Sequence, residues 1–235
     1  MIVMAGALSA CAQLEKLTEK SPRRHFQVSV DWVKRGPEKT NLNFRKINRF
    51  QSIAFEHPKA GPALIQGNAI DGVVAYRRAN GQEIWRRPIP NGVEAGAILQ
   101  GEHLFFGGLD GMFYAVNAVD GSVLWSFPTR IENIADPYFH DGLVYFLTGA
   151  NTLYALDAET GKQAWLYSRQ DGQALSIRGG SKPAYQNGSI YAGFSDGSVV
   201  ALNAKTGALK WEKQLNRNKR FRDLDSALTV ENEFL

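Results

Sequence analysis

The chain of 235 residues has one cysteine, Cys11. A single thiol excludes an internal disulfide framework and a cysteine-based zinc site. Histidine is also scarce, and His25, His57, His103 and His140 stand at intervals that do not match metal-ligand spacing. No phosphate-binding glycine loop is present. These absences argue against an enzyme, and we expect no catalytic residues, no metal and no cofactor.

Long hydrophobic runs are missing too, since no segment approaches the roughly 18 apolar residues that span a bilayer. The first eleven residues, MIVMAGALSAC, form a short apolar stretch that resembles a bacterial lipobox, in which the cysteine thiol accepts diacylglycerol. On that resemblance, residues 1–11 are a lipoprotein signal peptide and Cys11 is lipidated at the periplasmic side of the outer membrane. Because the stretch has no Lys or Arg before a minimal apolar run, a start further upstream or a plain N-terminal segment is the alternative.

Charge of one sign is not concentrated anywhere. The net charge is +4, from 27 Lys and Arg against 23 Asp and Glu, and the basic residues are spread over the whole chain. A nucleic-acid surface gathers its basic residues on one stretch or face. We therefore expect no nucleic-acid partner.

What the sequence does have is glycine and β-forming residues. It contains 23 Gly and 13 Phe, with 44% hydrophobic and 21% charged residues. Gly recurs beside β-branched and aromatic runs, a pattern typical of short strands joined by tight turns. The composition predicts a globular all-β protein.

A repeat runs through most of the chain. Four segments align on one pattern, 71–85, 110–125, 151–165 and 196–211. The alignment places two residue types in register, Gly81, Gly121, Gly161 and Gly207, and Trp85, Trp125, Trp165 and Trp211. The tryptophans are 40, 40 and 46 residues apart, so the last interval holds six extra residues, around LSIRGGSKP at 175–183. Insertions in repeat arrays map to loops on one face, often the binding face.

Each repeat reads as four short strands. In the second one, the β-rich runs 96–101, 103–110, 112–118 and 123–127 are separated by Gly-Glu and Asp-Gly turn signals. A four-stranded sheet of this size cannot bury both faces alone, so the repeats predict the stacked blades of a β-propeller. We expect the tryptophans, with the small Ala75, Ala115, Ala155 and Ala201, to pack between neighbouring blades.

The predicted organisation follows from these repeats. Blades are expected at about 50–88, 93–129, 133–169 and 180–215, and a partial blade at 223–235. The N-terminal segment 12–49 contains a candidate outer strand near Trp32 that would help to close the ring.

The run ALDAETGKQAW, at 155–165, resembles the repeat of the pyrroloquinoline-quinone (PQQ) propellers. A quinoprotein dehydrogenase of that class would need a bound quinone, a carboxylate-held cation, an aspartate base and a vicinal cysteine pair. The cysteine pair cannot form with one cysteine, and the Asp-Gly acids sit in turns, where they bond the local backbone. A periplasmic propeller that binds a small ligand or quinone is kept as the alternative function.

A narrower resemblance covers 174–211, which is similar to BamB-type outer-membrane lipoproteins of the β-barrel assembly machinery. Leu175, Ile177 and Arg178 occupy the places of a Leu-x-Leu-Arg-Gly run of that family, and Asp223 and Asp225 those of an Asp-x-Asp pair. The resemblance implies a non-catalytic scaffold that assists assembly by docking these residues on a POTRA domain of BamA. The alternative is that Leu175 and Ile177 pack under the loop and Arg178 bonds to Asp223 or Asp225 within the chain.

Ring closure is the last expectation. Members of that family have eight blades, whereas this sequence has four complete repeats and two half-blades. The half-blades can pair within one molecule, giving a small five-bladed ring, or between two molecules, giving a two-fold ring, and closed two-fold assemblies are the commonest oligomers. We expect the homodimer.

Overall fold

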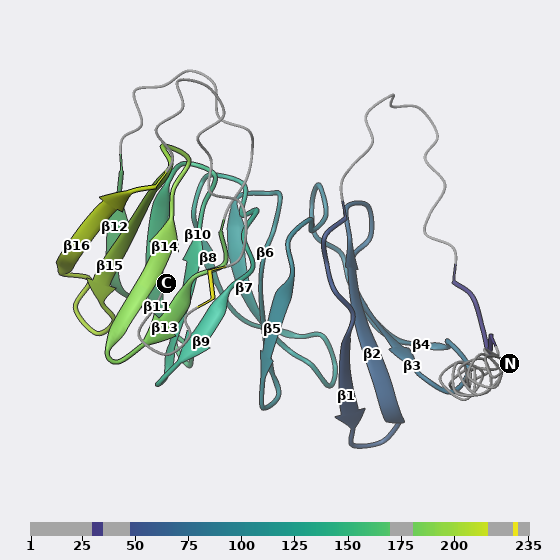
Figure 1. Ribbon diagram of the computed structural model, residues 1–235. Helices are drawn as coiled ribbons and strands as arrows, with labels where there is room; N and C mark the ends of the chain where they lie inside the picture. The colour runs from purple at the N-terminus through teal and green to yellow at the C-terminus, as the bar shows by residue number, and fades with distance from the viewer. Residues whose placement is uncertain (1–29, 35–47, 170–180, 216–227, 230–235) are drawn as a thin grey trace, which may run out of the picture. The chain divides into compact units, whose positions relative to one another are not determined.

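A computed structural model describes residues 30–34, 48–169, 181–215 and 228–229 (Figure 1). The chain divides into two compact units, Met1–Asp31 and Trp32–Leu235. All the strands belong to the second unit. Among the described residues no helix is long and apolar enough to cross a membrane.

In the described residues, sixteen strands form four sheets, each of four consecutive antiparallel strands. Blade 1 contains β1 (Ile53–His57), β2 (Gly61–Asn68), β3 (Gly72–Arg77) and β4 (Glu83–Arg87). Blade 2 contains β5 (Ala97–Gln100), β6 (His103–Gly107), β7 (Met112–Asn117) and β8 (Val123–Pro128). Blade 3 contains β9 (Tyr138–His140), β10 (Leu143–Leu147), β11 (Thr152–Asp157) and β12 (Gln163–Ser168). Blade 4 contains β13 (Ala184–Gln186), β14 (Ser189–Gly193), β15 (Ser198–Asn203) and β16 (Leu209–Gln214). The all-β prediction and the four propeller blades are confirmed.

The core lies in the seams between blades, because both faces of the middle strands are apolar. Seam 1/2, between blades 1 and 2, buries one cluster that includes Ile65 and Phe106. Seam 2/3 buries a second, in which the rings of Phe113 and Phe146 stack with centroids 3.8 Å apart. Seam 3/4 buries the third, which includes Tyr145 and Phe194. Each blade is therefore stabilised by its neighbours, as repeat architectures require.

One tryptophan locks each of these seams. The Trp85 ring on β4 covers Gly121 in the β7–β8 turn of the next blade, where a Cβ would lie 2.6 Å from the ring. The Trp85 indole donates a hydrogen bond to the Ala118 carbonyl oxygen, 2.8 Å away. Gly121 also has a φ of 70°, a left-handed conformation that glycine adopts without strain. Trp125 and Trp165 repeat this arrangement on Gly161 and Gly207 and bond to the carbonyls of Ala158 and Ala204.

The repeated alanines have a related role. Ala75 is the cross-strand partner of Trp85, and Ala115 is that of Trp125. Both alanines are fully buried. A small side chain leaves room for the indole to lie across the sheet, and the strand register shifts directly after it.

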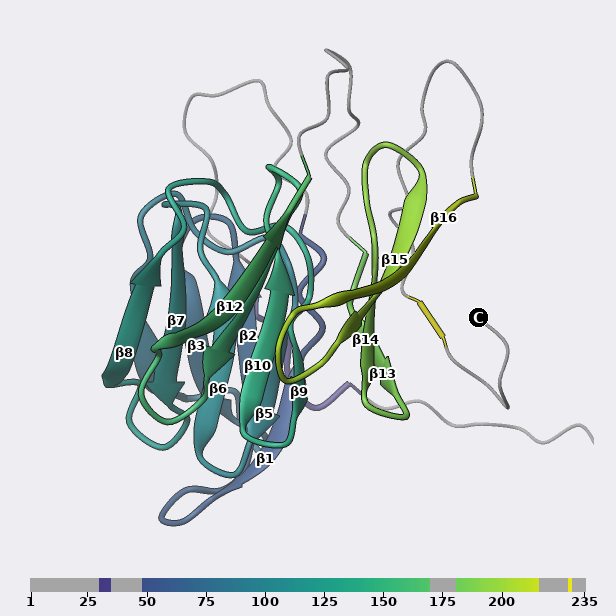
Figure 2. The same ribbon diagram turned by 90° about the vertical axis from the view of Figure 1, so that its left-hand side faces the viewer.

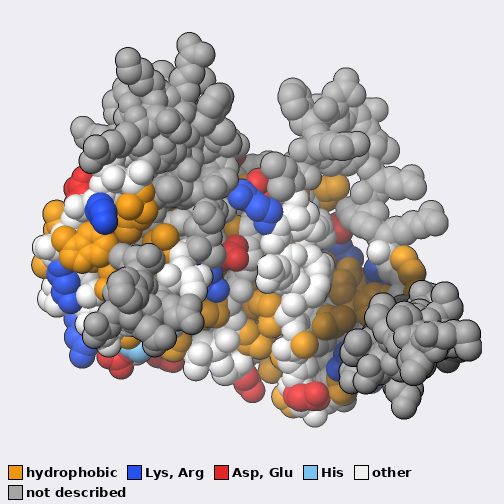
Figure 3. All heavy atoms as spheres, in the orientation of Figure 1, with side chains coloured by type: hydrophobic (Ala, Val, Ile, Leu, Met, Phe, Trp, Pro, Cys, Tyr) orange, Lys and Arg blue, Asp and Glu red, His pale blue; other side chains and the backbone are white. Residues whose placement is uncertain are grey.

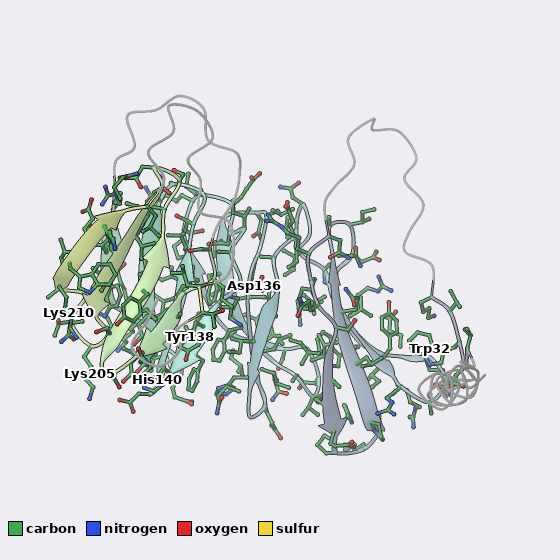
Figure 4. The ribbon with its side chains drawn as sticks, in the orientation of Figure 1. Trp32, Asp136, Tyr138, His140, Lys205 and Lys210 are labelled. Carbon is green, nitrogen blue, oxygen red and sulfur yellow. The ribbon has the colours of Figure 1, made fainter. Side chains whose placement is uncertain are left out.

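Trp32 makes the same lock on blade 1 from outside the four sheets. Its indole donates to the Arg78 carbonyl oxygen at 2.6 Å, and a Cβ on Gly81 would lie 2.8 Å from its ring. Figure 4 shows Trp32 beside the outer strands of this blade. Residues 30–34 are not in a strand, since no described segment pairs with them. The outer strand expected near Trp32 is thus missing from these residues, although its tryptophan occupies a seam position.

Trp211 on β16 differs from the other repeat tryptophans. It is 38% exposed, and Leu209 and Leu215 beside it are 51% and 55% exposed. Blade 4 is the last of the four sheets (Figure 2), and apolar side chains lie over its strands in Figure 3. The inter-blade packing predicted for Trp211 is therefore not met within the described residues, and the partial blade at 223–235 falls outside them except for Leu228 and Thr229.

Candidate interaction surface

The blades present two different ends, formed by different loops. The connection face holds the turns between the second and third strands of each blade and the described links from one blade to the next, such as 129–137. The hairpin face holds the remaining turns, such as 141–142, 187–188 and 204–208. Loops carried by a rigid scaffold are common sites of recognition.

The residues expected to bind a partner lie outside the described part of the chain. Leu175, Ile177 and Arg178 fall in 170–180, and Asp223 and Asp225 in 216–227. Cys11, the expected lipidation site, also lies outside it. The structure does describe the residues that border these two segments, and they meet at one turn.

That turn joins β14 to β15 of blade 4, at residues 194–197. Arg169, which precedes the segment 170–180, lies with its Nη2 2.6 Å from Asp196 Oδ2 in this turn. Leu215, which precedes the segment 216–227, donates its backbone N–H to the Gly197 carbonyl oxygen at 3.0 Å. The described residues that precede the two predicted docking segments therefore lie at adjacent points of the connection face.

Arg169 is held from three sides. Besides Asp196, it pairs with Glu212 Oε2 on β16 at 2.8 Å, and its guanidinium lies 5.8 Å from the centre of the Phe194 ring. The hydrogen bond to Glu212 and the charge of Asp196 raise the pKa of Arg169 above its ordinary value, although burial opposes this. Arg169 is only 20% exposed, so this is a partly buried network rather than a free surface charge.

Asp196 shows the opposite pKa shift. Burial alone would raise the pKa of its carboxyl, but hydrogen bonds from Ser198 and the charge of Arg169 outweigh it and bring the pKa below the ordinary value. The Ser198 hydroxyl and backbone N–H both donate to Asp196 Oδ1, at 2.5 and 2.9 Å. The carboxylate is therefore ionised at neutral pH and keeps Arg169 in place.

The far border of the segment 170–180 is fixed as well. Ser181 is fully buried; its hydroxyl accepts from the Gly193 N–H at 2.8 Å and donates to the Gly193 carbonyl at 3.1 Å. Gly193 ends β14, next to the turn that holds Arg169. Both borders of the segment are thus attached to one end of blade 4.

The same turn contains a catalytic sequence pattern that is not a catalytic site. Residues 193–197, GFSDG, match G-x-S-x-G. A nucleophile elbow places its serine between a strand and a helix, whereas Ser195 lies in a hairpin between β14 and β15. The Asn151 side chain donates to the Ser195 hydroxyl and accepts from its backbone N–H. These contacts join blades 3 and 4 and give the pattern a structural explanation.

Metal-ligating side chains do not gather in the described ranges, where no group of three or more His, Cys, Asp or Glu is placed to hold an ion. Three histidines lie instead at the hairpin face. They are next to the turn between the first two strands of blades 1, 2 and 3, at His57, His103 and His140 respectively. Their roles there are structural contacts with the next blade.

Four-stranded blades in sequence, each locked to the next by a tryptophan on a turn glycine, define this protein as a PQQ-like β-propeller. Residues 70–235 match the family described as "Outer membrane protein assembly factor BamB". The chain belongs to this family.

Individual relatives agree with that assignment. The outer membrane protein assembly factor BamB of Shewanella oneidensis is 28% identical over 170 residues, which are 64% of this chain and 43% of the relative. The crystal structure of BamB from Moraxella catarrhalis superposes with a TM-score of 0.65 at 22% identity, covering 78% of this chain and 56% of that one. A quinone-dependent alcohol dehydrogenase subunit of Gluconobacter oxydans is 39% identical over only 80 residues, 32% of this chain and 11% of the relative. The chain spans about half the length of the BamB relatives.

Proposed function

We propose that this protein is a non-catalytic scaffold in outer-membrane protein assembly, which docks through the connection face of blades 3 and 4 to a POTRA domain of a BamA-like partner. The proposal is supported by one observation: the residues that precede the two predicted docking segments both bond to the same turn of blade 4. Arg169 and Leu215 both bond to the turn after β14, and the segments that follow them contain Leu175, Ile177, Arg178 and the pair Asp223 and Asp225.

The side chains of these segments suit a protein partner. Leu175 and Ile177 supply apolar anchors, Arg178 can bond a carboxylate with two parallel hydrogen bonds, and Asp223 and Asp225 can accept from basic groups or backbone N–H. A rigid propeller presents such loops without paying the full entropy of ordering a flexible binder. The family name, which refers to assembly and not to a catalysed reaction, supports the same role.

The proposal places the protein at the periplasmic side of the outer membrane, attached through Cys11. The family name supports the outer-membrane location, and the lipobox-like residues before Cys11 support the anchor. A lipid anchor would hold the scaffold where a membrane-embedded partner extends its periplasmic domains.

Binding a small ligand or quinone is the second candidate, favoured by the short match to the alcohol dehydrogenase subunit. That match covers only 32% of this chain and 11% of the relative. Absorbance of the purified protein distinguishes the two, because a quinone absorbs at wavelengths where the polypeptide does not.

The decisive experiment is a pull-down of this protein with the purified periplasmic domains of a BamA-like partner. We expect retention by wild type and loss with Arg178→Ala, while Lys213→Ala on β16 serves as a matched control at an exposed basic residue. Equal retention of Arg178→Ala and Lys213→Ala would contradict docking through this segment.

A further inference from the structure

Seam 3/4 contains a hollow between its two blades. It has a volume of about 370 Å³ and opens on the hairpin face, between the first hairpin of blade 3 and the β15–β16 turn of blade 4. Figure 4 shows His140, Lys205 and Lys210 at this corner of the two blades. The hollow lies at the opposite end of the strands from Arg169 and Leu215.

The other two seams have a histidine contact at matching positions. In seam 1/2, His57 reaches the next blade, with Nε2 3.0 Å from the Val119 carbonyl oxygen. In seam 2/3, His103 Nδ1 lies 3.6 Å from Glu159 Oε1. In both seams an imidazole on one blade meets the turn of the next.

Seam 3/4 carries different residues at the places of that second pair. Strand pairing puts Leu143 where blade 2 has His103, and the repeat puts Lys205 where blade 3 has Glu159. A leucine side chain is shorter than an imidazole and cannot pair with a lysine. The space between blades is left open at this seam.

Aromatic rings form the walls of the hollow. Tyr185 of blade 4 stacks on His140 of blade 3, with ring centroids 3.6 Å apart and an interplanar angle of 24°. Tyr145 is 1% exposed and donates its hydroxyl to the Ala204 carbonyl oxygen at 3.1 Å. Burial raises the pKa of Tyr145 to about 12, so this wall is uncharged at neutral pH. A flat apolar group fits such a surface better than a charged one.

Positive charge predominates near the rim. Lys205 Nζ lies 3.6 Å from Asp141 Oδ2, but both side chains are well exposed, at 81% and 67%. An exposed pair of this kind is weak, so Lys205 can exchange Asp141 for another carboxylate at little cost. Lys210 Nζ donates to the Ser189 hydroxyl at 2.7 Å. It adds a second ammonium group beside the β13–β14 turn, whose Gly188 lines the hollow. The ligand that would complement these aromatic walls and this basic rim is an aromatic ring with an acidic group next to it.

We propose that this hollow is a docking pocket for an acidic, aromatic peptide segment of another protein, with the ring placed against Leu143 and Tyr185 and a neighbouring carboxylate on Lys205. Its volume is near the lower end of the range of about 300–1,000 Å³ for small-molecule pockets. That size favours one aromatic side chain over a larger cofactor. The pocket would give the propeller a second point of contact, independent of the connection face.

The test uses a fluorescein-labelled decapeptide with one phenylalanine between two glutamates, titrated into the 235-residue protein and followed by fluorescence anisotropy. We expect saturable binding that weakens by about tenfold or more with Lys205→Glu and not with Lys213→Glu, a control on the outer strand. Peptides in which alanine replaces phenylalanine, or lysines replace the glutamates, should bind at least about tenfold more weakly.

A double variant protects the test from a folding artefact. Leu143→His with Lys205→Glu introduces the His103–Glu159 pair of seam 2/3 into seam 3/4, so that a contact between the blades forms where the hollow was. We expect native circular dichroism and thermal stability with loss of peptide binding. Unchanged binding by this variant or by Lys205→Glu overturns the proposal, and so does equally tight binding of free phenylacetate, which would mark a small-molecule site. Retention of the BamA-like partner by Lys205→Glu separates this result from the proposed function.

Discussion

The ring of Trp165 on blade 3 covers Gly207 on blade 4, and its indole donates to the Ala204 carbonyl oxygen at 2.9 Å. Replacing Trp165 with alanine removes a buried ring and this hydrogen bond together, and neighbouring sheets cannot collapse to fill the space. We expect Trp165→Ala to lower the free energy of unfolding by about 3–5 kcal/mol. Urea denaturation monitored by circular dichroism measures the loss.

Trp211→Ala is the matched control, because Trp211 has the same repeat position but is 38% exposed. Its loss should be clearly smaller. Equal destabilisation by the two variants would show that the indole contributes through its own sheet and not through the seam.

Arg178→Ala tests the predicted docking residue against this structural effect. It should weaken binding to the BamA-like partner by about 1–4 kcal/mol and leave the unfolding curve unchanged, since truncating an interface anchor has a cost of that order. Isothermal titration calorimetry gives the affinity. If Arg178→Ala destabilises the fold as much as Trp165→Ala, Arg178 is structural and the docking role is wrong.

The seams could be predicted from the sequence because every repeat has a glycine and a tryptophan at the same spacing, as in Gly121 and Trp125 of blade 2. The surface that Trp211 packs against could not be predicted in this way. A repeat pattern identifies the residue that packs, but it does not identify the surface on which that residue packs. The hollow at seam 3/4 escaped for another reason. It arises from the differences between Leu143 and His103 and between Lys205 and Glu159, which gain meaning only after strand pairing aligns the blades. The convergence of Arg169 and Leu215 on one turn is likewise a contact between residues distant in sequence.

Asp196→Asn tests the network at the base of the docking segments. A carboxyl whose pKa is lower in the folded than in the unfolded chain stabilises the fold above the unfolded value and loses this contribution as the pH falls through the folded value. Asp196 has a lowered pKa, below the ordinary 3.8. Wild type should therefore be more stable than Asp196→Asn at pH 7, and the difference should shrink as the pH falls below about 4.

Urea denaturation across this pH range measures the effect, with Glu102→Gln, at an exposed carboxylate of the hairpin face, as the control. A difference between wild type and Asp196→Asn that stays constant down to the most acidic pH would show that Asp196 acts through the shape of its turn and not through its charge.

Lipidation of Cys11 is tested by growth with a radioactive fatty acid. Wild type should incorporate the label and sediment with outer membranes, whereas Cys11→Ser should be unlabelled and released into the periplasmic fraction. The anchor hypothesis would be wrong if wild type were unlabelled, or if Cys11→Ser were still labelled.

The homodimer prediction concerns the two unmatched blade edges. Trp32 covers Gly81 of blade 1 without a sheet of its own in the described residues, and Trp211 of blade 4 is exposed beside Leu209 and Leu215. Exposed strand edges and apolar sheet faces favour association, and pairing of the half-blades between two molecules would cover both in a two-fold ring. Light scattering of the 235-residue chain should give about twice its mass of 26.0 kDa. A chain cut after Asn216, which lacks the predicted inner half-blade, and the variant Trp211→Glu should both be monomeric, while Lys162→Glu, at an exposed residue between β11 and β12, should remain dimeric. A stable wild-type monomer would contradict the two-fold ring.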